Sequence, residues 1–251
     1  MRLKTVVAMA VSLFLLGTAS AQLSAVQIGA VVDNVRFEKG TRLAFVRIVN
    51  NSTKDITGFN LSIDVTYQNG QQYHYERMVD LLQSIILRQR LGLEDDGALH
   101  PQGRYEERLD LPSRGSSDNL AIAVSAKLDV VAYFDATADV VENGAALARL
   151  SSFRRNCIIA DQKAAEIINA AAANPVTPDA RGMAVNQLRT LMEQAKHKNG
   201  DHASETELAV IIADLERSRS EKGKSSLIQY ARDKYGDSEA MSAHASLRRS
   251  R

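Results

Sequence analysis

Residues 56–67 have the sequence ITGFNLSIDVTY, in which apolar and polar side chains alternate from Phe59 to Tyr67. A period of two predicts a β-strand with one buried face and one face in water. Asn69-Gly70 follows, and this pair favours a hairpin turn because both residues accept a positive φ. The stretch therefore predicts a β-hairpin whose returning strand covers Gln72–Tyr75.

Further strands are predicted on both sides of this hairpin. Arg42–Val49 is rich in apolar and β-branched residues, and residues 120–134 place an apolar side chain at every second position. Val26–Phe37 and Tyr105–Leu109 have weaker strand patterns. Short strands separated by turns, within about 115 residues, predict an antiparallel β-sandwich over residues 22–139.

One helix is predicted inside the strand-rich half. Its apolar residues have helical spacing over residues 78–90, at Met78, Leu81, Leu82, Ile85 and Ile86. We expect this inserted helix to cap an open end of the sandwich or to present these five residues to a partner.

The period changes from two to three or four near residue 140. Leu150, Ile158 and Ile168 mark a long helix, and later stripes such as Leu208, Ile211 and Leu215 mark further ones. We expect a C-terminal α-helical region over residues 140–251, either packed as a bundle or docked on the sandwich or a partner. The basic tail Ser246–Arg251 is expected to be frayed.

The N-terminus has the three parts of a secretory signal peptide. Arg2 and Lys4 precede the apolar run Val6–Leu16, and Ala19 and Ala21 occupy the small-residue positions of a cleavage site. The run is too short to span a bilayer, which argues against the alternative of a membrane anchor. The sequence predicts cleavage before Gln22 and a periplasmic or secreted protein with no membrane span in the mature chain.

Composition argues against nucleic-acid binding and limits the disulfides that the chain can form. The 31 Lys and Arg residues nearly balance the 30 Asp and Glu residues, which argues against a dedicated nucleic-acid binder. Cys157 is the single cysteine, so no internal disulfide can form. We expect Cys157 to be a small buried residue, with an intermolecular disulfide as the alternative.

No motif predicts a catalytic, cofactor-binding or metal-binding site. Gly223-Lys224-Ser225 resembles the end of a phosphate-binding loop, but position 218, where that loop needs Gly, is Ser. His197, Asp201 and His202 lack the spacing of helical metal ligands, and Glu94-Asp95-Asp96 lacks the pattern of a calcium loop. We expect solvated turns at these places, and no cofactor.

A few other side chains are candidates for chemistry or binding. His74 and His100 could each act as a general base if the fold supplied partners. Tyr73, Tyr75 and Tyr105 are the candidates for an exposed aromatic cluster of the kind that stacks on carbohydrate.

The segment from Phe45 to Gly70 resembles an immunoglobulin-like module of exported bacterial proteins. One apolar strand ends in Asn50-Asn51-Ser52, and the next ends in Tyr67 and the turn residue Gly70. The nearest type is the FxLYD module, over roughly residues 43–70. The resemblance implies a sandwich and, by analogy, an adhesive or scaffolding role, and it carries no catalytic residues.

Three functions are consistent with these patterns. The first is an exported, non-enzymatic binding or scaffolding protein of the cell envelope, whose partner could be another envelope protein. The second is a hydrolase of unfamiliar type with His74 or His100 as base. The third is a structural protein that assembles through its C-terminal helices.

Overall fold

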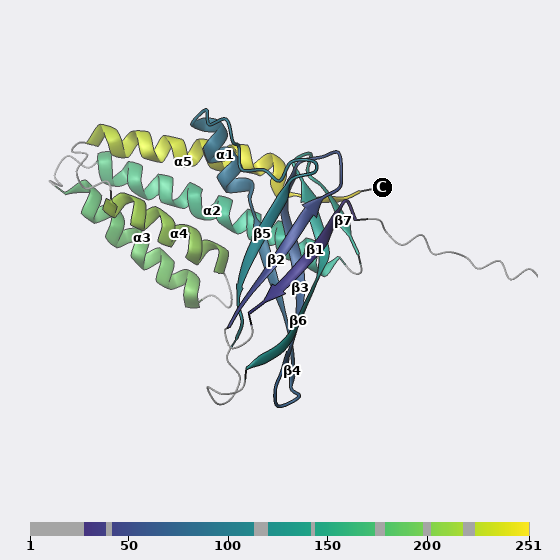
Figure 1. The fold of residues 1–251 in the computed structure, drawn as a ribbon. Coiled ribbons are helices and arrows are strands. Elements are labelled where there is room, and N and C mark those ends of the chain that lie inside the picture. The colour runs from purple at the N-terminus through teal and green to yellow at the C-terminus, as the bar shows by residue number, and fades with distance from the viewer. Residues whose placement is uncertain are drawn as a thin grey trace, which may run out of the picture.

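The computed structural model describes residues 28–38, 42–112, 120–141, 144–173, 179–197, 202–217 and 224–250. The predicted signal peptide and its cleavage site lie outside these residues. The described part is α+β, as predicted, with five helices and two sheets. Figure 1 shows the helices α2 to α5 lying side by side on one side of the strands.

Before residue 141 the described elements are strands interrupted by one helix, and after it they are mostly helices. The strands are β1 (Ala30–Phe37), β2 (Leu43–Asn50), β3 (Ile56–Tyr67), β4 (Gln72–Asp80), β5 (Arg104–Asp110), β6 (Ala121–Tyr133), β7 (Thr137–Val140) and β8 (Arg248–Arg249). The helices are α1 (Leu82–Arg90), α2 (Ala145–Ala173), α3 (Ala180–His197), α4 (His202–Arg217) and α5 (Lys224–Ala245).

The strands form a three-stranded sheet in the order β1-β2-β5 and a five-stranded sheet in the order β4-β3-β6-β7-β8. The hairpin predicted from residues 56–70 is present: β3 and β4 pair antiparallel, and Gly70 has a φ of 80° in the turn. The returning strand is longer than predicted because pairing continues to Asp80, which lies opposite Gly58.

The two sheets share one hydrophobic core. It contains Val46 and Ile48 from β2, Leu109 from β5, and Phe59 and Leu61 from β3. The side chains that alternate along β3 therefore pack between the sheets, as their spacing predicts.

The opposite face of β3 is in water only near Asp64, whose side chain is 61% exposed, so the prediction is wrong for the rest of this face. Thr57, Asn60 and Ser62 are only 0%, 3% and 5% exposed. A second apolar cluster lies over the same sheet, where Ala146 and Leu150 of α2 pack on Val130 and Ala132 of β6. Since a helix covers this face, its polar residues form hydrogen bonds inside the protein.

The C-terminal helices pack mainly on one another. Ile168 of α2, Leu188 of α3, Leu208 and Ile211 of α4 and Leu227 of α5 belong to one buried cluster. The apolar stripes predicted from the sequence are therefore covered within the chain. Among the described helices, none has the length and apolar character to cross a membrane.

Helix α1 begins at Leu82, four residues later than predicted. Met78 belongs to β4, because its strand pairs with β3 up to Asp80. Leu81 then donates its backbone N–H to Thr57 O at 2.8 Å, and Leu82 donates to Asp80 Oδ1 at 3.3 Å. Strand pairing thus prevails over the helical spacing of Met78.

The basic tail is also not frayed as expected. Arg248–Arg249 forms β8, which pairs in parallel with β7. Arg248 donates its backbone N–H to Ala136 O at 2.9 Å, and Ser250 donates to Ala138 O at 2.7 Å. The end of the chain therefore extends the five-stranded sheet.

Candidate functional site

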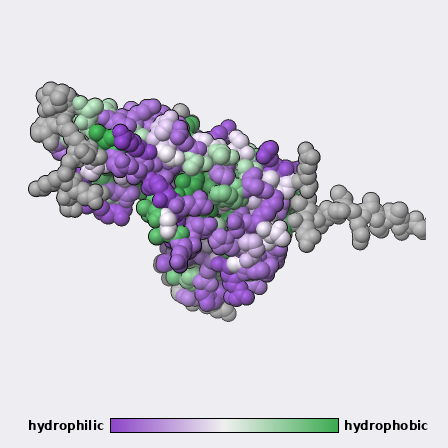
Figure 2. All heavy atoms as spheres, turned by 90° about the horizontal axis from the view of Figure 1, so that it is seen from above, coloured by the Kyte–Doolittle hydropathy of each residue, from purple (hydrophilic) through white to green (hydrophobic). Residues whose placement is uncertain are grey.

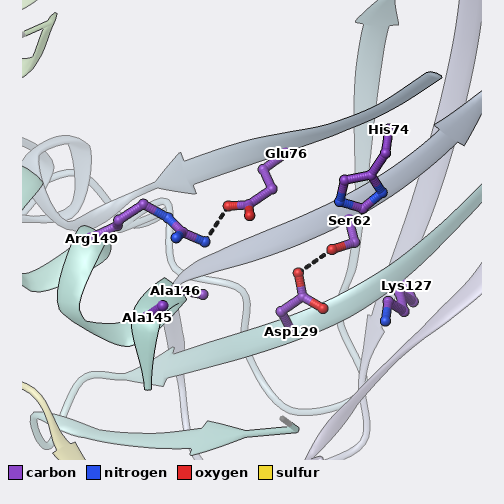
Figure 3. A pocket seen from close by; sticks show the side chains of 8 residues that line it. All are labelled: Ser62, His74, Glu76, Lys127, Asp129, Ala145, Ala146 and Arg149. Carbon is purple, nitrogen blue, oxygen red and sulfur yellow. Dashed lines mark hydrogen bonds and ion pairs between the residues drawn. The ribbon is translucent and has the colours of Figure 1, made fainter. Parts of the chain in front are cut away.

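A polar pocket of about 200 Å³ lies on the outer face of the five-stranded sheet. Strands β4, β3 and β6 form its floor, and the first two turns of α2 close one end. Figure 3 shows its lining side chains, which are Ser62, His74, Glu76, Lys127, Asp129, Ala145, Ala146 and Arg149.

A β-bulge places Asp129 in this pocket. Leu61 pairs with Leu128 and Asn60 pairs with Val130, so Asp129 is an extra residue in β6. Bulges of this kind redirect a side chain and are common beside functional sites. The Asp129 carboxylate accepts hydrogen bonds from the Ser62 hydroxyl and from Asn60 Nδ2, the latter at 3.2 Å.

Glu76 provides a second carboxylate across β3. Asn60 Nδ2 also donates to Glu76 Oε2 at 3.3 Å, so one amide group bridges the two carboxylates. Arg149 of α2 forms an ion pair with the same Glu76 oxygen. The two acidic side chains are thereby fixed by donors from β3 and α2.

Among the described residues, the pocket has charges of both signs. Lys127 and Arg149 are cationic, and Glu76 and Asp129 are anionic. Figure 3 shows Arg149 and Glu76 directed toward each other on one side, with His74 and Lys127 on the other. His74 Nδ1 lies 2.8 Å from Asp64 Oδ1, which orients the imidazole ring at the rim.

No metal site is formed by the described residues. In the ranges that the structure describes, no group of three or more His, Cys, Asp or Glu side chains is placed to hold a metal ion. His197 ends α3 and His202 begins α4, with the His202 side chain 86% exposed, while Asp201 lies outside the described residues. Lys224 begins α5, and Gly223 also lies outside.

The acidic loop and His100 form ion pairs with each other and with Arg88 and Asp55. Arg88 forms an ion pair with Asp95 at 3.1 Å, and His100 contacts Asp55 at 2.8 Å through Nδ1 and Asp96 at 3.1 Å through Nε2. The hydrogen bond with Asp55 is the main cause that raises the pKa of His100. Because carboxylates occupy both ring nitrogens, His100 is poorly placed to act as a base.

The three tyrosines do not form an exposed cluster. Tyr73 and Tyr75 stack with ring centroids 5.9 Å apart, and Tyr105 meets Phe59 edge-on at 5.5 Å. All three pack against the core between the sheets. Burial raises the pKa of Tyr75 to about 12. Cys157 is likewise buried, in the middle of α2.

The five residues predicted to bind a partner are covered by the chain itself. Leu82, Ile85 and Ile86 are buried, and Met78 and Leu81 are half-buried. Leu82 and Ile86 pack on residues of α2 and α5. The exposed apolar residues of this region are instead Leu87, Leu91 and Leu93. Figure 2 shows hydrophobic surface near the middle of the molecule, where α1 lies.

The sequence predictions missed the pocket apart from His74. Ser62, Glu76, Lys127 and Asp129 occur at polar positions of three separate strands, and of these only Ser62 was predicted to face water. Their common face becomes visible only once the strand order β4-β3-β6 and the bulge are known. Comparison with protein-family models, curated proteins and solved structures finds no match for this chain.

Proposed function

We propose that this chain is an exported binding protein of the cell envelope that holds a small polar ligand in the pocket beside α2. The observation that carries the proposal is the convergence of charged and polar side chains from β3, β4, β6 and α2 on one cavity. Small-molecule sites are concave and use a few fixed polar groups to orient the ligand. The hydrogen bonds of Asn60 and Ser62 fix the two carboxylates in this way.

The proposed fold of the strand-rich half is an immunoglobulin-like sandwich. Two sheets with a shared core, antiparallel except for the β7–β8 pair, support this assignment, as does the resemblance over residues 43–70. The α2 helix is additional to such a module, and it forms one wall of the pocket. The ligand site is therefore formed jointly by α2 and the five-stranded sheet.

A ligand screen on the purified full chain tests the proposed function. Amino acids, sugars, carboxylates, nucleosides and inorganic ions are compared by thermal shift, and calorimetry follows for any compound that raises Tm. A ligand that binds only the folded state raises Tm with its concentration. We expect at least one class to do so.

A double variant and a matched control locate the binding. Asp129→Asn with Arg149→Gln changes the pocket, while Glu106→Gln changes an exposed carboxylate on β5. We expect the Tm rise to disappear in the double variant and to persist in Glu106→Gln. If every compound gives the same response in all three proteins, the proposal fails.

A hydrolase remains the second candidate because Asp64 orients His74 beside Ser62. The pair resembles the base and its orienting carboxylate in a nucleophilic site. The Ser62 hydroxyl, however, donates to Asp129 rather than to His74. We expect hydrolysis of an activated acetate ester to be the same for the wild type and for Ser62→Ala. A loss of turnover in the variant would favour the hydrolase.

A further inference from the structure

The pocket presents two opposite charges side by side. Arg149 and Glu76 form an ion pair at its edge, and Asp129 lies on the other side of the Asn60 amide. A ligand that complements this arrangement needs a cation and an anion close together. Complementary charges of this kind set specificity more than affinity.

The carboxylates retain capacity to accept hydrogen bonds. The contacts of Glu76 use Oε2, and those of Asp129 use Oδ2. Glu76 Oε1 and Asp129 Oδ1 accept no hydrogen bond from the part of the chain that the structure describes. A carboxylate oxygen without a donor attracts an N–H group, and a primary ammonium has three such groups.

The guanidinium of Arg149 is the matching anion-binding group. Only one of its terminal nitrogens contacts Glu76, and a guanidinium has five N–H donors in a planar fork. The Arg149 side chain is 49% exposed at the mouth of the pocket, so a ligand carboxylate can approach it.

Resting on the proposed function, we propose that the ligand is a free α-amino acid. Its ammonium donates to Glu76 Oε1 and Asp129 Oδ1, the oxygens that the Asn60 amide does not use, and its carboxylate faces Arg149. Among the described residues, no Phe or Tyr side chain lines the pocket, so a quaternary ammonium, which these rings recognise, fits it poorly. A volume of about 200 Å³ suits a small amino acid such as glycine or serine.

Calorimetry with six probes on the purified full chain tests this inference. Glycine and serine carry both charges close together, and ε-aminocaproate carries them far apart. Ethylamine carries the cation alone, acetate carries the anion alone, and glycine betaine cannot donate a hydrogen bond from its nitrogen. We expect glycine and serine to bind, and each of the other probes to bind at least about tenfold more weakly.

Two single variants assign the charges. Asp129→Asn and Arg149→Gln should each weaken glycine binding about tenfold, whereas Glu106→Gln should not change it. Circular dichroism confirms that each variant is folded. The two proposals fail separately: pocket-dependent binding of a sugar or nucleoside, with no amino acid binding, overturns this inference and leaves the proposed function standing. Equal binding of glycine, betaine and acetate also overturns it.

Discussion

Arg154 joins three elements through one buried guanidinium. It is 1% exposed, and it donates to Asp80 from β4, to the backbone and hydroxyl oxygens of Thr57 in β3, and to His244 O at the end of α5. Disrupting a buried, fully hydrogen-bonded ion pair is costly because removing one partner leaves the charge of the other unpaired.

Replacing Arg154 should therefore destabilise the whole protein. We expect Arg154→Ala to lower the free energy of unfolding by about 3–5 kcal/mol, since Asp80 would keep a charge without its partner. Arg155→Ala is the control, because that neighbouring side chain is exposed and should cost less than about 0.5 kcal/mol. Urea unfolding measures both; equal losses would show that Arg154 has no special role.

Asp161 is a second buried titratable group, and it gives stability a pH dependence. It is fully buried in α2, and Lys234 Nζ lies 3.5 Å from its Oδ1. Burial, with the nearby charge of Glu207, raises the pKa of Asp161 to about 8. The folded state therefore keeps a proton that the unfolded state releases above about pH 4. The stability that this group contributes is lost as pH rises from about pH 4 to about pH 8.

Asp161→Asn should remove this part of the pH dependence. The amide stays neutral at every pH, so the variant should gain stability relative to the wild type as pH rises from about pH 4 to about pH 8, by several kcal/mol. Urea unfolding at several pH values measures the difference. A constant difference between variant and wild type across the range would contradict the assignment.

Helix α1 depends on the C-terminal helices for its packing. Ile85 is fully buried, whereas Leu87 on the same helix is 40% exposed. Ile85→Ala should lower the free energy of unfolding by about 3 kcal/mol, through lost apolar contact and the cavity left behind. Leu87→Ala is the matched control and should change it by less than about 0.5 kcal/mol. Chemical denaturation tests the pair, and similar values would mean that α1 is not anchored through Ile85.

Sequence patterns identified most helices and strands, but not the distant elements that each of them contacts. The alternation in β3 predicted its strand and the hairpin, because a period of two has few other solutions. The start of α1 was placed at Met78 because helical spacing and strand pairing compete there, and pairing depends on a distant partner. β8 was missed for the same reason, since two basic residues carry no strand pattern of their own.

The site was beyond reach of the sequence because it depends on register. Ser62, Glu76 and Asp129 are ordinary polar positions when each strand is considered alone. They meet only because β3 lies between β4 and β6 and because one extra residue redirects Asp129. Likewise, Arg154 and Asp161 are charged residues in a helix, where exposure is the usual expectation.

For the whole molecule, the proposed export predicts a defined N-terminus. Expressed in a bacterial host, the protein should be recovered from the periplasm with Gln22 as its first residue, because Ala19 and Ala21 form the predicted cleavage site. N-terminal sequencing measures this. Ala21→Leu should block cleavage and leave the precursor intact. Uncut wild-type protein in the cytoplasm would remove the assignment of the compartment.

Helix α1 packs on α5, which comes much later in the sequence. Leu82 and Ile86 find their cover on Met241 and Ala245, which are synthesised near the end of the chain. In a chain that leaves the cell N-terminus first, as proposed, these leucine and isoleucine side chains stay uncovered until α5 has passed through the translocation channel. Helix α1 then reaches its final packing only after α5 has passed through the channel.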